Sequence, residues 1–186
     1  MEKIILASGS PRRRELLEQA GIPFEVIKSD AEEIITKTEP AEIVKELSLC
    51  KAQVVADAHP GRLVLGADTI VVLDGQVLGK PKSTEHAAAM LRALQGRTHQ
   101  VYTGVTLIRD GQAHSFYEKT DVTLYTMTDE DIRNYVESGD CMDKAGAYGI
   151  QGRFAVHIKG ICGDYYTVVG LPVARLWQEM KARGWA

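Results

Sequence analysis

The chain has 186 residues, 45% hydrophobic and 25% charged, which suits one globular domain over 1–186 with a substantial core. Its net charge of −3 argues against a nucleic-acid-binding protein, because such proteins usually present a strongly basic face. Scattered cysteines and histidines exclude a zinc-type spacing, and neither a signal peptide nor a membrane-length apolar run is recognisable, so we expect a cytoplasmic protein without membrane partners.

The first stretch predicts a strand, a tight turn and a helix. Ile4–Leu6 is a short apolar run, and the helix that follows has Ser10 as its N-cap and Pro11 at its first position. Gly21 ends this helix. The turn between strand and helix is built from small polar residues, which leave backbone amides available to an anion.

Three consecutive arginines in the first turn of that helix are unusual. Each cation at a helix N-terminus costs about 0.3–1 kcal/mol, and a broken local rule of this kind tends to mark function. We expect Arg12 and Arg13 to contact phosphate or another anionic ligand, and Arg14 to be a solvated surface residue. A solvated basic cap is the alternative for all three.

The next elements carry two further charged candidates. Phe24–Ile27 alternates like a strand and leads to Glu33, for which metal binding and plain solvation are both open. Pro40 begins a long amphipathic helix, and Lys51 falls late on it. On its own, this lysine would be an ordinary surface residue.

Asp68 is the strongest catalytic candidate from the residues alone. We expect the apolar strand Leu63–Leu65 to end at Gly66–Thr69 and a second strand to begin at Ile70. An aspartate between apolar strands is costly to bury unless it is paired or binds a metal, and Gly66 leaves room for a ligand. The alternative is an aspartate that hydrogen-bonds its own backbone in a turn.

Turn and cap residues divide the middle of the chain clearly. Asp74-Gly75 predicts a hairpin, and Pro81 stiffens the backbone at Lys80. The elements expected next are a helix over Glu85–Gln95, β-structure over Thr98–Met127 and a helix from Thr128 to Gly139.

The loop Asp143–Gly152 is the second unusual segment. Its glycines allow close approach of the backbone to a ligand, while Lys144, Tyr148 and Gln151 offer a charge, a ring face and an amide. A merely irregular turn is the alternative. Phe154–Ile158 then predicts a strand with His157 as a partly buried strand residue.

The last expected helix is Val173–Arg183. Its apolar stripe predicts core packing for Val173, Leu176, Trp177 and Met180.

Five segments in this order resemble the Maf family of nucleoside triphosphate pyrophosphatases. They are Leu6–Arg13, Gly66–Thr69, Gly79–Pro81, Asp143–Gly152 and Gly163–Pro172. The resemblance implies an α/β fold with a long twisted mixed central sheet, helices on both sides and two lobes around a cleft, related to the inosine triphosphate pyrophosphatases. It also implies a homodimer.

Within the family the chain resembles the branch that acts on dTTP and UTP, which has Thr at the position of Thr69 and Gln at that of Gln151. The resemblance implies Asp68 as the catalytic proton acceptor and Glu33 with Asp68 as ligands of Mg²⁺ or Mn²⁺. The alternative for Asp68 is that it orients a metal-bound water as a metal ligand and does not itself accept the proton. The resemblance also implies the following substrate-binding residues: Ser8, Arg12, Arg13, Lys51, Thr69, Lys80 and Gln151.

The expected reaction is hydrolysis of dTTP and UTP to the monophosphate and pyrophosphate, with modified pyrimidine nucleotides as a further option. Such an activity fits cleaning of the nucleotide pool, and members of the family have been tied to arrest of cell division. The alternative is a nucleotide-sensing regulator of septum formation without significant turnover. Retention of Asp68 favours the enzyme, since triphosphate binding alone would be stronger without a negative charge there.

Overall fold

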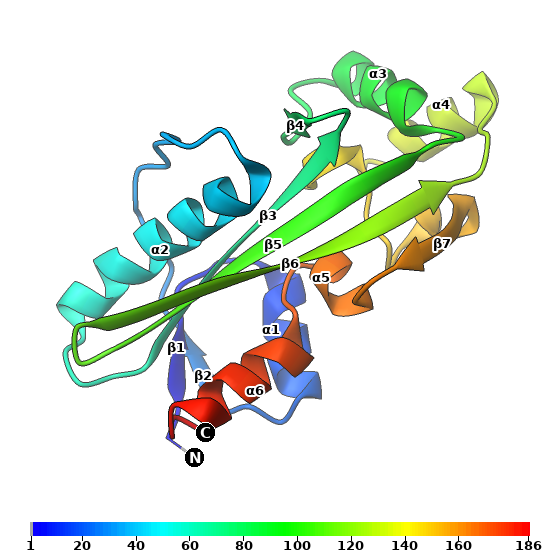
Figure 1. Cartoon of the computed structure of the whole chain (residues 1–186). Coiled ribbons are helices and arrows are strands. Elements are labelled where there is room, and N and C mark those ends of the chain that lie inside the picture. The colour runs from blue at the N-terminus through cyan, green and yellow to red at the C-terminus, as the bar shows by residue number, and fades with distance from the viewer. Residues whose placement is uncertain (1) are drawn as a thin grey trace. The chain divides into compact units, whose positions relative to one another are not determined.

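The computed structural model of the chain describes residues 2–186 (Figure 1). The elements follow in the order β1 (Ile4–Leu6), α1 (Pro11–Gln19), β2 (Phe24–Val26), α2 (Pro40–Ala58), β3 (Val64–Leu73), β4 (Gln76–Leu78), α3 (Thr84–Leu94), β5 (Thr98–Arg109), β6 (Gln112–Leu124), α4 (Asp129–Glu137), η1 (Ala145–Ala147), η2 (Arg153–His157), β7 (Ile158–Cys162), α5 (Tyr165–Val169) and α6 (Val173–Ala182).

Within residues 2–186, seven strands form one mixed sheet in the order β2-β1-β3-β5-β6-β7, with β4 paired to β3. Strand β1 is parallel to β2 and β3, whereas β4 runs antiparallel to β3 and β7 antiparallel to β6. The α/β class and the mixed sheet predicted above are confirmed. In the described chain, no helix combines the length and apolar character needed to cross a bilayer.

The chain divides into two compact units. Unit 1 comprises the residues up to Asp68, Thr103–Glu118 and Gly170–Ala186, and unit 2 comprises Thr69–Tyr102 and Lys119–Val169. Strands β3, β5 and β6 each contribute residues to both units. The expectation of a single domain over 1–186 stays a prediction.

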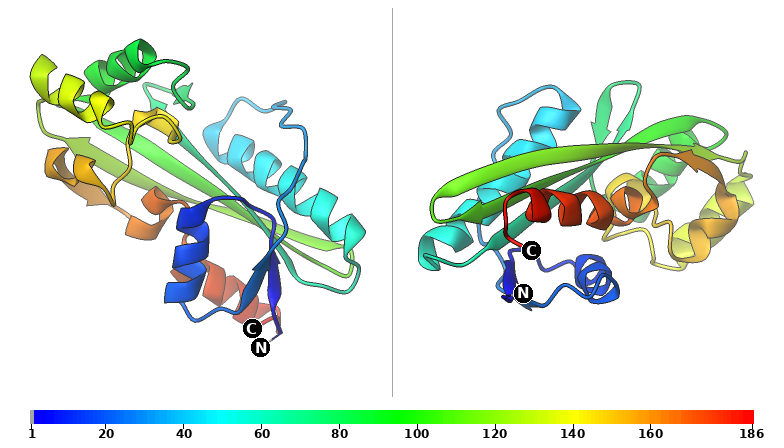
Figure 2. Two further views of the ribbon diagram at one scale, coloured as in Figure 1. Left: turned by 180° about the vertical axis from the view of Figure 1, so that it is seen from behind. Right: turned by 60° about the horizontal axis from the view of Figure 1, so that its bottom comes forward.

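In unit 1, two glycines allow α2 to lie unusually close to the sheet. A Cβ at Gly66 of β3 would be 2.3 Å from the Ser48 carbonyl oxygen, and a Cβ at Gly104 of β5 would be 2.2 Å from that of Val44. Any side chain at either position would therefore push the helix off the strands. Figure 2 shows α2 on one side of these strands and α6 on the other.

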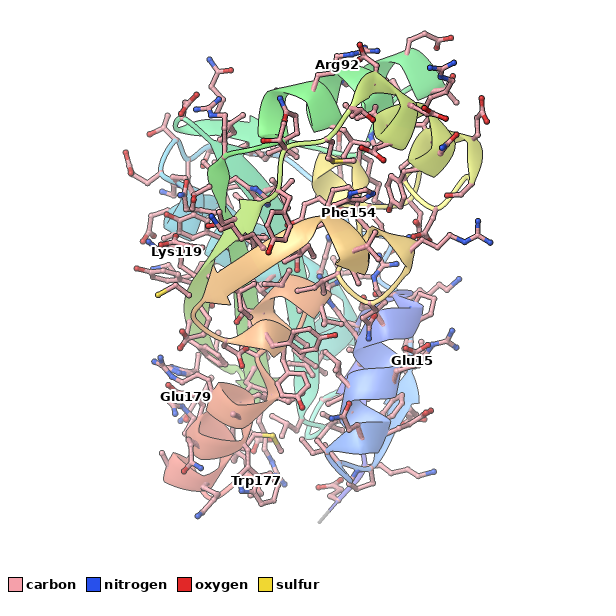
Figure 3. The ribbon with its side chains drawn as sticks, turned by 90° about the vertical axis from the view of Figure 1, so that its right-hand side faces the viewer. Glu15, Arg92, Lys119, Phe154, Trp177 and Glu179 are labelled. Atoms are coloured by element: carbon pink, nitrogen blue, oxygen red, sulfur yellow. The ribbon has the colours of Figure 1, made fainter. Side chains whose placement is uncertain are left out.

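In unit 2, one apolar core joins the strands to the helices. Helices α3 and α4 pack against each other, and η1 packs against α3. The core is aromatic at its centre, where the Phe154 ring lies 4.7 Å from that of Tyr148 and 4.9 Å from that of Tyr135. Phe154 comes from the 3₁₀ turn that precedes β7 (Figure 3).

Most predicted helix ends are confirmed by their cap geometry, although Ser10, at the N-cap of α1, makes no side-chain capping hydrogen bond. Gly21, Gly96 and Gly139 follow α1, α3 and α4 with φ of 66°, 66° and 75°, the left-handed conformation that favours glycine. The Ser83 hydroxyl accepts a hydrogen bond from the His86 amide, and Thr128 forms a full capping box with Asp131.

Three local predictions were wrong. Gly66–Thr69 does not separate two strands, because β3 continues without a break from Val64 to Leu73. Residues Phe154–His157 form a 3₁₀ turn instead of a strand, so His157 is not a strand residue. Trp177 is 37% exposed on α6, whereas Leu176 and Met180 are buried as expected (Figure 3).

His99 makes the core of unit 2 sensitive to acid. Its side chain is fully buried, and burial lowers the pKa of the imidazole from 6.5 to about 4. Below pH 6.5, His99 is therefore protonated in the unfolded chain but stays neutral in the folded chain. As a result, the free energy of unfolding decreases as the pH falls toward 4.

We predict that this histidine alone lowers the free energy of unfolding by about 3 kcal/mol between pH 6.5 and pH 4. The measurement is urea unfolding over that range for the parent and for His99→Gln, which cannot titrate. The variant should show a flatter pH dependence whatever its stability at neutral pH. Parallel pH profiles would show that His99 does not titrate as its burial requires.

Candidate active site

The turn between β1 and α1 places Ser8 and Arg13 against each other inside unit 1. Arg13 is only 9% exposed, unlike Arg14, which lies on the surface. Its Nη1 donates to Ser8 Oγ at 3.0 Å, and its Nε donates to the Gly170 carbonyl oxygen at 2.8 Å. The guanidinium thus ties the first turn of α1 to the segment that precedes α6.

Lys51 contacts both Asp68, the predicted catalytic residue, and Glu33, a predicted metal ligand. Its Nζ lies 2.5 Å from Asp68 Oδ1 and 2.9 Å from Glu33 Oε1. Asp68 is 9% exposed, within the interior of β3, while the Glu33 side chain is 56% exposed. Helix α2, strand β3 and the segment after β2 therefore bring these three residues together.

Arg13 belongs to the same electrostatic cluster. Burial lowers the pKa of its guanidinium, and the negative charge of Asp68 opposes that shift most strongly. Arg12 lowers the pKa of Arg13 further, and Glu33 raises it. The fields of Asp68 and Glu33 thus act on Arg13 as well as on Lys51.

The carboxylates suit a magnesium-type ion that is bound together with phosphate. Within residues 2–186, no group of three or more His, Cys, Asp or Glu side chains could hold a metal by itself. Mg²⁺, however, commonly uses only one or two carboxylates and completes its shell with water and substrate phosphates. Asp68 and Glu33, which share the Lys51 ammonium, fit that donor set.

In unit 2, Gly146 connects the segments that carry the other predicted residues. Its amide donates to the Gly79 carbonyl oxygen at 3.1 Å, next to the exposed Lys80. A Cβ on Gly146 would lie 2.9 Å from the Val71 side chain, two residues beyond Thr69 in β3. With its φ of 70°, this position favours glycine both for conformation and for space.

The loop Asp143–Gly152 offers less to a ligand than its composition suggests. The Lys144 ammonium is held by the Asp140 carbonyl oxygen at 2.6 Å and by Asp143 Oδ1 at 2.8 Å. Tyr148 is buried in the core, so its ring face is not available. Gln151 is exposed and is the member of this trio that can reach a ligand.

Two further features of the site differ from the sequence expectations. The space beside Gly66 holds the backbone of α2 and not a ligand. The Gly170 carbonyl as a partner of Arg13 was missed, because backbone acceptors leave no signal in residue type. A turn-forming Gly-Leu-Pro sequence before a helix was the available hint.

The buried fork of Arg13 leads to a stability prediction. Arg13→Lys keeps the charge but cannot reproduce both hydrogen bonds, so we expect a loss of about 1.5–3 kcal/mol in the free energy of unfolding. Arg14→Lys, the matched change at an exposed neighbour, should have little effect. Equal unfolding midpoints for the two variants in urea would contradict this role of Arg13.

Comparison with known proteins places these observations in a family. The family model described as Maf-like protein matches residues 3–183. A dTTP/UTP pyrophosphatase of Agathobacter rectalis is 55% identical over 99% of this chain and 98% of its own length. Proteins of the same name from Bacillus cytotoxicus and Bacillus mycoides are each 53% identical over 97% of this chain and 95% of theirs.

A solved structure shares the fold at lower identity. The Ham1 protein of Staphylococcus aureus superposes with a TM-score of 0.50 and 18% identity, covering 66% of this chain and 72% of its own. That likeness shows the fold alone. The family match and the full-length relatives go further, and the chain belongs to the Maf family.

Proposed function

We propose that this chain hydrolyses dTTP and UTP to the corresponding monophosphate and pyrophosphate. The observation that carries the proposal is the Lys51–Asp68–Glu33 cluster, in a chain more than half identical to a full-length dTTP/UTP pyrophosphatase. Hydrolysis of a triphosphate needs cations for its oxygens and a carboxylate that orients water. Unit 1 contains both kinds of group.

The phosphates bind to residues that are cationic or can donate hydrogen bonds. In this proposal Lys51 and Arg12 contact the triphosphate directly, and Lys80 adds a further charge. Arg13 and Ser8 hold the turn that precedes α1, where small residues let a phosphate approach backbone amides. Because these contacts do not involve the base, they should serve any nucleoside triphosphate.

Asp68 acts on the attacking water. Water adds to the α-phosphorus, the bond from that phosphorus to the α–β bridging oxygen breaks, and pyrophosphate leaves. The Asp68 carboxylate orients the water and receives its proton. Lys51, at 2.5 Å from Asp68 Oδ1, keeps the carboxylate in place before substrate arrives.

Asp68 and Glu33 would also hold the divalent cation, Mg²⁺ or Mn²⁺. Within the cluster, Asp68 and Glu33 offset the charges of Arg13 and Lys51, so that only Arg12 and Lys80 add net positive charge, which is too little for a triphosphate. A bound divalent cation would supply additional neutralisation of the phosphate oxygens. Lys51 could then contact phosphate, since its two carboxylate partners would have another cation.

Base recognition is assigned to Arg12, Thr69 and Gln151. Uracil and thymine present carbonyl oxygens at O2 and O4, whereas cytosine has an amino group at position 4. Arginine only donates, so near O4 it favours a carbonyl and rejects an amine. The Gln151 amide can rotate to suit either edge unless a neighbour fixes it.

The setting follows from the reaction. Nucleoside triphosphates are dissolved metabolites of the cytoplasm, so we place the protein there, acting on the nucleotide pool and not on nucleic acid. A homodimer and a link to cell-division arrest are further parts of the proposal. They rest on the resemblance to the family alone.

The chemistry is tested by Asp68→Asn, which keeps the shape of the side chain and removes its charge. Release of pyrophosphate from dTTP with Mg²⁺ or Mn²⁺ should fall by about 10²–10⁴-fold, the scale of a general acid–base group. Asp57→Asn, on the exposed face of α2, is the matched control and should retain activity. Nucleotide binding without pyrophosphate release by the parent would instead support a sensor.

Base choice is tested by kcat/KM for dTTP, UTP and CTP. We expect both uracil-type substrates to exceed CTP by roughly two orders of magnitude or more, because a mismatched base leaves polar groups of the site unpaired. Gln151→Glu cannot donate to O4 and should reduce the preference, as should Arg12→Ala. Gln178→Glu, on the surface of α6, is the control. Unchanged ratios in both variants would place base recognition elsewhere.

A further inference from the structure

A polar pair lies inside the apolar core of unit 2. His99 of β5 is fully buried, and its Nε2 lies 2.6 Å from the hydroxyl oxygen of Tyr148. Tyr148 is 5% exposed and follows η1 directly. Neither residue has a role in the catalytic scheme above.

Burying this pair in the core costs free energy. Within the described chain, His99 Nδ1 is buried without a hydrogen-bond partner, so the Tyr148 hydroxyl supplies the bond recorded for this imidazole. A buried polar atom without a partner is destabilising, and an apolar pair of similar volume would avoid that penalty. A satisfied buried hydrogen bond, however, restricts the two side chains to a single geometry.

Both groups are uncharged over the physiological range. Burial lowers the pKa of His99 to about 4 and raises that of Tyr148 above its ordinary value. The bond is therefore a neutral one throughout the physiological pH range.

Tyr148 is one end of a short span that carries Gln151. The residues just before it are fixed, since Gly146 packs on Val71 and Ala147 has a φ of 64°. The other end is Phe154, which is fully buried against the Tyr148 ring. Gln151 lies on the five residues between these two buried rings.

We propose that His99 and Tyr148 are positioning residues, whose hydrogen bond holds the 149–152 segment so that Gln151 presents its amide in a fixed place. The consequence for base selection rests on the proposed function, in which Gln151 contacts the base. The rings of Tyr148 and Phe154 anchor the segment against the core, and the hydroxyl sets its register. The variant Tyr148→Phe keeps the ring that packs against the core and loses the hydroxyl that bonds to His99.

The variant that separates these roles is Tyr148→Phe. Tyr125→Phe removes a hydroxyl from an exposed tyrosine of the same unit, and Ile132→Val weakens the same core without touching the pair. Hydrogen–deuterium exchange of the 149–152 amides reports the segment directly, and kcat/KM for dTTP and CTP reports selection.

In Tyr148→Phe we expect exchange at 149–152 to become several-fold faster while α6 is unchanged. We also expect the dTTP-to-CTP ratio to fall by about tenfold, mainly through KM for dTTP, because small misplacements of a positioning group have effects of this size or larger. Ile132→Val should lower the melting temperature without altering the ratio. A role confined to stability would leave the ratio unchanged in Tyr148→Phe as well.

Unchanged exchange at 149–152 in Tyr148→Phe would overturn the proposal, as would an unchanged ratio. If Tyr148→Phe does not fold, His99→Leu takes its place, since leucine fills part of the same space but can neither donate nor accept a hydrogen bond, and it should shift the same two measurements. Failure of the parent to hydrolyse dTTP would refute the proposed function instead. The exchange experiment would still decide whether the pair holds the segment.

Discussion

The ion pair between Lys51 and Asp68 depends on how closely α2 can approach the sheet. Asp68 sits in the interior of a ten-residue strand, where an unpaired carboxylate would be strongly disfavoured. Its partner comes from a helix whose backbone lies where a Cβ of Gly66 or Gly104 would be. The two glycines therefore serve the site indirectly, because they bring the lysine within 2.5 Å of the carboxylate.

The same ion pair explains why the cluster suits a ligand that brings both anions and a cation. With Glu33 at 2.9 Å, Lys51 has two carboxylate partners and is electrostatically satisfied. A free triphosphate would have to compete with these carboxylates for the ammonium. A triphosphate that arrives with a divalent cation meets no such competition, since the carboxylates and the phosphates can each find a positive charge.

The sequence was most informative where a residue type has one dominant structural use. Gly21, Gly96 and Gly139 end helices, Asp74-Gly75 turns a hairpin, and Thr128 with Asp131 begins α4, all as predicted. The errors arose where a residue has two uses. Gly66 was interpreted as the end of a strand with room for a ligand, but in a strand interior glycine also marks close approach of another backbone, which depends on residues far away in the chain.

The sequence suggested candidate members of the site but not how they are arranged. Arg13 and Asp68 were candidates from the residues alone, Glu33 stayed open between metal binding and solvation, and Lys51 followed only from the resemblance. The hydrogen bonds that the Arg13 guanidinium donates to Ser8 and to the Gly170 carbonyl oxygen could not be predicted from residue types. Which partner a charged side chain takes is decided by tertiary contacts, and lone lysines such as Lys51 carry no local signature at all.

The loop that follows Asp143 illustrates how chemically active residue types divide between structure and ligand. The Lys144 ammonium is bound by Asp140 and Asp143, and the Tyr148 hydroxyl is hydrogen-bonded to the buried imidazole of His99. Both are internal, so a glycine-rich loop with a lysine and a tyrosine is not by itself a ligand loop. These bonds lie on residues of the same loop as Gln151, and a glutamine amide can distinguish two bases only if something prevents it from rotating. In the proposed function, the residues of this loop that resemble ligand contacts would therefore serve to hold the exposed Gln151 amide in one orientation.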